Sequence, residues 1–491
     1  MNVSPKNLAI WSMTMIGSVA WATAAPQKNK NVNTKPYPYG NPVIHHLYTA
    51  DAAPKVMPDG RVWMVTSIDH ENGGGYSTMH AIRAFSTVDM KNWVDEGEIL
   101  HLDDLNEKPG EDWAIWAPDI VYRNGTYYLY FPMRNIRADG RMDRYVAVAE
   151  SPSMRKRFQV TNPRMRGVPT AGLDPAVFID DDGSAYLYWN QLFMGELRDD
   201  MRDIKGRPFK LNIGANNFME AAWMHKRAGR YYFNYHTKYD GKIDPENPDN
   251  PARKKSLLDY SMGDSPSGPL KHMGTINHEL GVGVTNGPKL PGRDYVPWRL
   301  TQSNHGGVVE YHGQEYLFYH NSALSSWRQD EFKGPGTWTQ RSVCVDYLNY
   351  APDGSIIPVR QTIEGVSAVK IDQPFEILLS SDARFKSNII EFQNVKFGTG
   401  YYYFDATLKS DPAFKGKIEI RLDRADGPLV GTCLLHPERL KTRNGLFDTY
   451  IRDAKGSRNI FLVLLPDTET EAHDITLLSP RFFAGAPEQG K

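Results

Sequence analysis

The stretch AGLDPAVFIDDDGSAYLYWN, Ala171 to Asn190, decides the fold, because altered copies of it recur four more times in the chain. Each copy begins with a short apolar run, passes through a polar turn that ends in glycine, and finishes with alternating aromatic and β-branched residues. This pattern predicts a β-hairpin, in which the glycine supplies the positive φ that the turn needs. The five copies open at Asp51, Trp116, Asp174, Glu220 and His305.

Repeats at this spacing, with strand signals throughout, predict a β-propeller. We therefore expect an all-β chain in which a five-bladed propeller precedes a smaller β-sandwich of the jelly-roll kind. The innermost strand of every blade runs beside the central channel, so residues at one register of the repeat point to one place. The residues that open the copies would then bring three carboxylates, one indole and one imidazole into one axial pocket.

Composition excludes several classes of function. The chain has 491 residues, a formal net charge of −1 and 12% aromatic residues. This length permits two or three domains, and the charge gives no general attraction to nucleic acid or to an anionic membrane. Cys344 and Cys433 are too few for a disulfide framework and are expected to be buried free thiols. A single bridge between them is the alternative.

Domain boundaries follow changes in the pattern. Residues 1–25 hold a lysine, a brief apolar run and a terminal group of small residues, which predict a signal peptide and export to the periplasm, the cell surface or the medium. An uncleaved anchor is the alternative, and no later segment is apolar enough to span a bilayer. Residues 26–40 are predicted to be a linker or strap, residues 41–362 the propeller and residues 363–491 the sandwich.

The repeats also resemble glycoside hydrolase family 43, whose catalytic domain is a five-bladed propeller with three axial carboxylates. The resemblance covers about Asn41 to Val359. The motifs that carry it are YTADAAP around Asp51, WAPDIVYRNGTYYLYF around Trp116, LDPAVFIDDDGSAYLYW around Asp174, EAAWMHKRAGRYYFNYH around Glu220 and NHGGVVEYHGQEYLFYH around His305.

This resemblance implies that Asp51 is the general base, Glu220 the general acid, and Asp174 the carboxylate that orients the acid and tunes its pKa. Inverting hydrolysis needs one carboxylate to activate water and one carboxylic acid to protonate the leaving oxygen. A third carboxylate nearby raises the pKa of the acid, so that it stays protonated. Because an isolated aspartate before a strand is more often a turn residue, the assignment depends on the shared register of all three.

Three further residues take roles from the same resemblance. His305 is implied to help hold a calcium ion on the propeller axis, in a shell made mostly of water and carbonyl oxygens, with a hydrogen-bonded core histidine as the alternative. Trp116 is expected to form an apolar wall for a sugar ring, or else to pack in the core. Arg341 matches the arginine that holds the hydroxyls of the terminal sugar, and a buried structural salt bridge is its alternative.

Other acidic residues are expected to be structural. Asp180, Asp181 and Asp182 are predicted to be solvated turn residues rather than a metal site, and Asp119 is predicted to have a structural role. In the last domain, KFGTGYYYFDATL and GKIEIRLDRADGPLVGTC resemble a family 6 carbohydrate-binding module. Its usual tryptophan-rich stretch is replaced by RNGLFDTYI, so a structural partnership with the propeller stands beside glycan binding as an expectation.

Together these features predict an exported, exo-acting, inverting glycosidase that removes α-L-arabinofuranosyl or β-D-xylosyl units from plant or algal polysaccharides or oligosaccharides. Galactosidase or endo-arabinanase action on the same scaffold is one alternative, because sugar choice resides in loops rather than in the carboxylates. A glycan-binding propeller without catalysis is the other. Three like charges in one pocket argue against it, since a binding module gains nothing from their repulsion.

Overall fold

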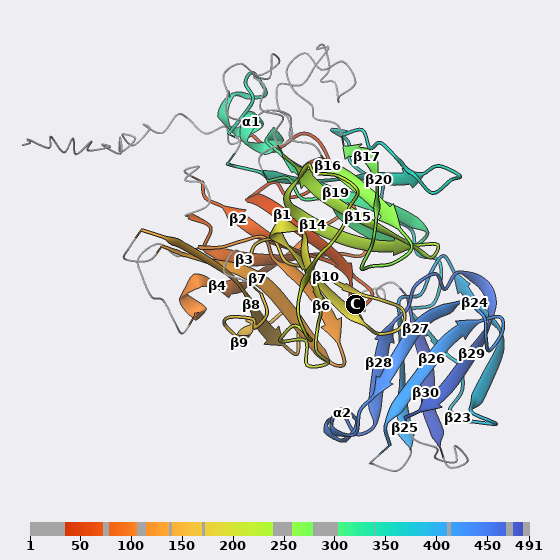
Figure 1. Cartoon of the computed structure of the whole chain (residues 1–491). Coiled ribbons are helices and arrows are strands. Elements are labelled where there is room, and N and C mark those ends of the chain that lie inside the picture. Colours follow the sequence, from red (N-terminus) through yellow and green to blue (C-terminus); the bar gives the residue numbers. More distant parts are fainter. Residues whose placement is uncertain are drawn as a thin grey trace, which may run out of the picture.

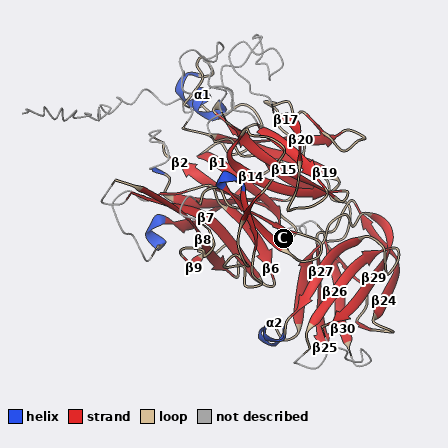
Figure 2. Cartoon of the chain, viewed as in Figure 1, coloured by secondary structure: helices blue, strands red, loops and turns tan. Residues whose placement is uncertain are grey.

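The computed structural model describes residues 35–71, 78–105, 114–136, 140–168, 172–238, 258–277, 303–337, 339–409, 414–467 and 475–484. The first part of the chain folds into five antiparallel sheets, each made from consecutive strands (Figures 1 and 2). The first sheet contains β1 (Tyr48–Val56), β2 (Val62–Asp69), β3 (Ala81–Thr87) and β4 (Val94–His101), and the second contains β5 (Ala114–Ile115), β6 (Asp119–Arg123), β7 (Thr126–Ile136), β8 (Met142–Ser151) and β9 (Gln159–Asn162). The third sheet contains β10 (Ala176–Ile179), β11 (Ala185–Trp189), β12 (Phe193–Glu196) and β13 (Phe209–Lys210), and the fourth contains β14 (Phe218–Arg227), β15 (Arg230–Thr237), β16 (Leu258–Gly263) and β17 (Lys271–Asn277). The fifth sheet contains β18 (Gly307–Tyr311), β19 (Gln314–Asn321), β20 (Ser342–Tyr350) and β21 (Ile356–Ile357).

These sheets are the blades of a five-bladed propeller, as the repeat predicted. Each innermost strand contacts the innermost strand of the next blade, in the order β1, β6, β10, β14 and β18. Strand β18 in turn contacts β1, so the ring is closed. No strand is exchanged between the first and last blades in the described part of the propeller, because every sheet uses consecutive strands.

The alternating aromatic residues of the repeat pack the blades against one another. In the third copy, Ile179 pairs with Ala185 across a turn in which Gly183 has a φ of 82°. Along β11, Leu187 packs in a cluster shared with the second blade, whereas Tyr188 packs in a cluster shared with the fourth blade. Successive side chains of a strand point to opposite faces, so the alternation buries both faces of each blade.

Two features near the ends of the propeller were not fully foreseen. The helix α1 (Ala323–Asp330) lies between β19 and β20 of the last blade, and among the described residues no helix of this length joins the corresponding strands of the other blades. Tyr37 is buried, and its ring lies 6.3 Å from that of Trp327 in α1. The Asn41 amide donates to the carbonyl oxygens of Val345 and Thr362. Within the predicted linker or strap, Tyr37 therefore packs against α1.

The last part of the chain forms two packed sheets with their own apolar core. One sheet contains β22 (Glu376–Leu378), β23 (Asp382–Arg384), β25 (Tyr403–Lys409), β28 (Leu446–Tyr450) and β30 (Thr476–Phe483), and the other contains β24 (Ile389–Gly398), β26 (Gly416–Leu422), β27 (Leu429–Leu435) and β29 (Gly456–Pro466). A short helix, α2 (Pro437–Thr442), follows β27, and two 3-10 turns, Leu102–Asp104 and Asn190–Leu192, belong to the propeller. The blue domain of Figure 1 is this sandwich, and it lies beside the propeller.

Several other expectations can be placed on the structure. Cys344 and Cys433 are both free and buried, which confirms the prediction of two free thiols. The predicted signal peptide, residues 1–25, lies outside the described residues. Within the residues that are described, no helix is long and apolar enough to cross a membrane. Asp119 accepts the backbone N–H of Val177 at 2.6 Å and pairs with Lys55 at 3.4 Å, so it ties three blades together.

The sandwich docks at the end of the propeller channel that lies away from the residues that open the repeats. A cavity of about 130 Å³ separates the two domains there. Lys55, Phe178 and Trp223 line it from innermost strands of the propeller, and Tyr403 and Arg452 line it from the sandwich. The sandwich therefore covers the far mouth of the channel.

The prediction of solvated turn residues is wrong for two of the three aspartates after β10. Asp180 is buried and accepts hydrogen bonds from Lys226 and Tyr231. Asp181 lies 2.7 Å from Nη1 of Arg452, a residue of the sandwich. The guanidinium of Arg452 also donates to the carbonyl oxygen of Ile179. The sequence of the turn indicated exposure to solvent because the residue that covers it, Arg452, belongs to a domain that is distant in the sequence.

The Arg452→Ala substitution is expected to weaken the docking of the sandwich and to lower the free energy of unfolding by about 2 kcal/mol. It would remove one of the two cationic partners of Asp181, the other being Lys226, and the stacking of the guanidinium on Phe178 and Tyr450, whose ring centroids lie at 4.7 and 4.8 Å. Thermal unfolding would show this as a fall in Tm of a few degrees.

Arg458→Ala is the matched control for that measurement. Arg458 is also on the sandwich and pairs with an aspartate, Asp423, but this pair is exposed and lies within the sandwich. Exposed pairs contribute about 0–1 kcal/mol. Equal Tm values for the two variants would show that Arg452 does not anchor the domains.

Candidate active site

Two of the three predicted carboxylates lie where an innermost strand is irregular, and the third lies just before an innermost strand. Asp51 has a φ of 57° and sits where the pairing of β1 with β2 shifts between Ala50 and Ala53. Asp174 has a φ of 49° just before β10. Glu220 lies at a shift in the pairing of β14 with β15 and is followed by Ala221, whose φ is 61°. Positive φ is uncommon for residues other than glycine and concentrates at functional sites.

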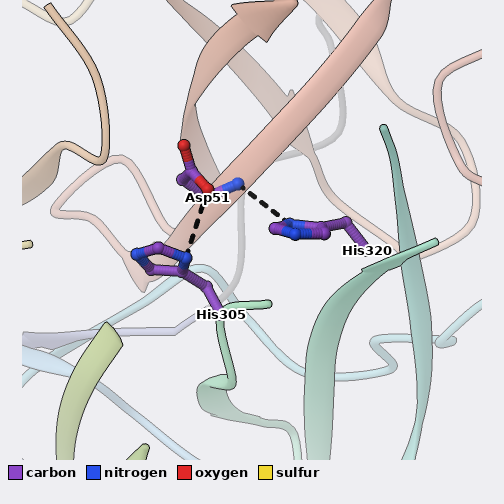
Figure 3. Close-up of side chains that lie close together, drawn as sticks. All are labelled: Asp51, His305 and His320. Carbon is purple, nitrogen blue, oxygen red and sulfur yellow. Dashed lines mark hydrogen bonds and ion pairs between the residues drawn. The ribbon is translucent and has the colours of Figure 1, made fainter. Parts of the chain in front are cut away.

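Asp51 is held by two cationic side chains, of which Figure 3 shows His305. Its Oδ1 atom lies 2.8 Å from Nη1 of Arg341 and 3.2 Å from Nδ1 of His305, and its backbone N–H donates to Nδ1 of His320. Burial alone would raise the pKa of Asp51, but the attraction of Arg341 and His305 outweighs it and holds that pKa well below the usual range. Asp51 is therefore a carboxylate, the form that a general base requires.

The second oxygen of Asp51 is available for chemistry. Oδ2 is buried and has no hydrogen-bond partner among the residues that the structure describes. An unpaired buried carboxylate oxygen is costly unless water or a ligand reaches it. One oxygen of Asp51 is thus fixed by the protein, while the other is left to accept a proton.

Asp174 links the cluster around Asp51 to the segment that carries Glu220. Its Oδ2 atom accepts the backbone N–H of Ala221 at 3.0 Å, and its Oδ1 atom lies 4.0 Å from Nε2 of His305. Burial, together with repulsion from Glu220 and Asp51, raises the pKa of Asp174 to about 7. Because Asp174 binds the residue that follows Glu220, it fixes the backbone from which the acid projects.

Glu220 is partly exposed and has one side-chain oxygen without a partner in the described chain. Its side chain is 12% exposed, and its Oε1 atom lies 3.8 Å from Nδ1 of the buried His236. Within the described chain, Oε1 makes no hydrogen bond. The structure thus leaves this oxygen for a group that enters the pocket.

His305 lies between the two aspartates. Its Nδ1 atom is 2.9 Å from the carbonyl oxygen of Ser303 as well as 3.2 Å from Asp51. Burial lowers the pKa of His305, but contact with Asp51 and the charge of Asp174 outweigh it and raise that pKa to about 9. In the absence of a bound cation, His305 is therefore an imidazolium that holds the carboxylates together. Its Nε2 atom is buried, with no hydrogen-bond partner in the described residues.

The other two predicted residues border the same site. Trp116 is buried and packs with Met79, Ala117 and Leu173, the residue before Asp174. Its position suits an apolar wall, and its role in holding a sugar ring stays a prediction. The guanidinium of Arg341 is buried and makes hydrogen bonds to carboxylates, as the salt-bridge alternative proposed, so its contact with sugar hydroxyls also stays a prediction.

Three residues near the site were missed from the sequence: Asp69, His236 and His320. They lie near the ends of β2, β15 and β19, which are the second strands of their hairpins. Antiparallel pairing puts the end of the second strand beside the start of the first, so Glu220 pairs with His236 and Tyr48 pairs with Asp69. A polar residue that ends an apolar second strand, as in TSID, FNYH and LFYH, is the signal that could have found them.

Replacement of Asp174 by asparagine is expected to stabilise the protein at neutral pH while it abolishes activity. The pKa of Asp174 is about 7 in the folded protein and 3.8 as its usual value, so stability falls as pH rises from about 4 to 7. Asparagine removes this cost and keeps an acceptor for Ala221. Tm at pH 8 should rise by a few degrees, and the difference should vanish near pH 4.

The control is Asp182→Asn in the exposed part of the neighbouring turn. It removes an aspartate charge without changing a buried group, so its Tm difference should not depend on pH. A Tm difference for Asp174→Asn that is equally independent of pH would contradict the raised pKa.

Comparison with known proteins shows which enzymes the chain is similar to. Residues 39–282 match the family model "Glycosyl hydrolases family 43". Xylosidase/arabinosidase 43A of Humicola insolens is 28% identical over 373 residues, which cover 64% of this chain and 98% of that protein. Arabinoxylan arabinofuranohydrolase of Paenibacillus polymyxa is 26% identical over 494 residues, which cover 86% of this chain and 71% of that protein.

A solved structure agrees with the fold. CoXyl43, a GH43 β-xylosidase/α-arabinofuranosidase from a compost microbial metagenome, was determined with xylotriose in a calcium-free form. It superposes with a TM-score of 0.50 at 25% sequence identity and covers 66% of this chain and 99% of its own. The similarity therefore corresponds in extent to the propeller.

Proposed function

Because this chain carries a glycoside hydrolase family 43 domain and is a glycoside hydrolase, we propose that it releases terminal α-L-arabinofuranosyl or β-D-xylosyl units from xylan or arabinoxylan, with inversion at the anomeric carbon. The observation that carries the proposal is one buried cluster that joins Asp51, Asp174 and the segment of Glu220. The names of the relatives, xylosidase/arabinosidase and arabinoxylan arabinofuranohydrolase, support the choice of sugars.

In the proposed reaction, Oδ2 of Asp51 accepts a proton from the attacking water, and Glu220 gives a proton to the leaving oxygen. Asp174 fixes the backbone beside Glu220 through the N–H of Ala221. Trp116 contributes an apolar wall, and Arg341 holds Asp51 and the hydroxyls of the sugar.

The test is hydrolysis by the full chain of p-nitrophenyl α-L-arabinofuranoside, β-D-xylopyranoside and, for comparison, β-D-galactofuranoside. Activity on the first or second substrate is expected, and NMR of the fresh product should show the inverted anomer. Arabinoxylan should yield free pentose without a fall in viscosity at early times. The proposal would be overturned if the protein hydrolyses neither arabinoxylan nor any of these glycosides, or if the fresh product has the retained anomer.

We also propose that a calcium ion binds on the propeller axis beside His305. The donor set fits a hydrated ion, because the buried Nε2 atom of His305 has no hydrogen-bond partner in the described chain and calcium completes its shell with water and other oxygens. The ion would supply positive charge near Asp51 and Asp174. Addition of calcium to chelator-treated protein is expected to raise Tm by a few degrees, and His305→Ala should abolish this rise. An equal rise in His305→Ala would place the ion elsewhere.

The proposed function also includes export of the protein from the cell. Residues 1–25 would act as a signal peptide, since xylan and arabinoxylan are polymers that are met outside the cell. The sandwich would serve mainly as a structural partner, which its position over the far mouth of the channel supports. Amino-terminal sequencing of the exported protein tests the cleavage, and an intact amino terminus would contradict it.

A further inference from the structure

Asp69 is a buried carboxylate beside the site that the proposed reaction does not use. It ends β2 and makes a three-bond contact with Arg341. Oδ2 of Asp69 accepts the backbone N–H and the Nε–H of Arg341, both at 2.9 Å, and Oδ1 accepts Nη2 at 2.8 Å. Asp69 is 5% exposed and Arg341 is 3% exposed. A two-point contact between a carboxylate and the planar guanidinium fixes its orientation as well as its position.

The remaining arm of that guanidinium reaches the general base. Nη1 of Arg341 donates to Oδ1 of Asp51 at 2.8 Å, and Nη2 also contacts the Met79 sulfur at 3.3 Å. Asp69, Arg341 and Asp51 come from β2, from the residue before β20, and from β1. The chain of contacts therefore runs from the first blade through the last and back to the first.

We propose that Asp69 is a positioning residue for the general base. It holds Arg341 so that the guanidinium ties down Oδ1 of Asp51 and leaves Oδ2 for the attacking water. This role rests on the proposed function, in which Asp51 is the base. Asp69 touches neither substrate nor water in this account, and it acts only through Arg341.

The physical reason lies in the flexibility of arginine. A side chain with four rotatable bonds keeps one geometry only where its donors are held, and Asp69 holds two side-chain donors and the backbone N–H of Arg341. A displacement of about 1 Å near the reacting atoms can reduce a rate by about 100-fold. Loss of Asp69 should thus lower kcat more than it raises KM, because Arg341, which is proposed to hold the sugar hydroxyls, remains in the pocket while its hold on Oδ1 of Asp51 loosens.

The first experiment compares wild type with Asp69→Asn, which keeps the size of the side chain. We expect kcat for p-nitrophenyl α-L-arabinofuranoside or β-D-xyloside to fall about 10–100-fold and KM to change less than about threefold. Asp259→Asn is the matched control. Asp259 is also 5% exposed, but it lies in β16 of the fourth blade and is bound by Asn217 and Thr275. That variant should lose stability without a loss of kcat.

The second experiment separates positioning from a general structural role. In the Asp51→Asn background the base is already absent, so addition of Asp69→Asn should cause almost no further loss. In the Glu220→Gln background the full loss from Asp69→Asn should remain. A purely structural defect would instead multiply in both backgrounds. Should Asp69→Asn fail to fold, Asp69→Glu keeps the charge, displaces the guanidinium, and carries the same expectations.

The outcomes are distinct. If the wild type is active, three results would overturn the positioning role and leave the proposed function in place. They are an Asp69→Asn variant with unimpaired activity, an Asp69→Asn variant in which only KM rises, and losses that multiply when Asp69→Asn is added to Asp51→Asn. A wild type without activity on any of the glycosides would overturn the proposed function and the positioning role together.

Discussion

Substitution of Asp51 by asparagine is expected to reduce kcat by about 10²–10⁴-fold, the contribution of a positioned general base. Asparagine matches aspartate in size and can still accept the hydrogen bond from Nη1 of Arg341, so the pocket should keep its shape. It cannot accept a proton from water, and the attacking nucleophile is then neutral water without assistance. KM should change little, because the base contributes to the transition state rather than to binding.

A small external nucleophile distinguishes this role from a structural one. The Asp51→Gly variant leaves space beside the reacting carbon, and azide needs no base, so added azide should restore part of the activity and give a glycosyl azide of inverted configuration. Asp346→Asn is the control, since Asp346 is a comparably buried carboxylate of the last blade, held by Tyr319 and Thr362 outside the site. Activity in Asp51→Asn that matches this control would remove Asp51 from the mechanism.

The repeat made both the fold and the three carboxylates predictable. A hairpin pattern that returns five times sets the number of blades, and a shared register converts sequence position into a position around the axis. Asp51, Asp174 and Glu220 could therefore be grouped although they lie far apart in the chain. The structure adds that Asp51 and Glu220 lie at irregularities of innermost strands and that Asp174 has a positive φ just before one, which a pattern of apolar and polar residues does not reveal.

The repeat could not predict features of the site that depend on contacts between segments with no shared sequence pattern. Asp69 and His236 reach the site from second strands, where the apolar alternation hides a single polar residue at the end. Asp181 looked like an ordinary turn residue because Arg452, which buries it, belongs to another domain. Arg341 could be identified as important, but its bonds to Asp69 and Asp51 required the blades to be placed beside each other.

Glu220→Gln is expected to have an effect that depends on the leaving group. On arabinoxylan or xylobiose, where the leaving oxygen belongs to a sugar and must be protonated, kcat/KM should fall by about 10²–10⁴-fold. On a dinitrophenyl glycoside the leaving phenolate departs without a proton, so the loss should be much smaller. Glutamine keeps the shape of the side chain and removes the acidic proton, which Oε1 of Glu220 is left to deliver.

The ratio of these two losses identifies the acid independently of overall activity. Asp51→Asn should lose activity to the same extent on both substrates, because water must be activated whatever the leaving group is. Glu220→Gln should show the unequal pattern, and the double variant should combine the two losses. Equal losses on both substrates for Glu220→Gln would mean that proton donation comes from another group. Asp174 would then be the first candidate, because its pKa of about 7 keeps much of it protonated at neutral pH.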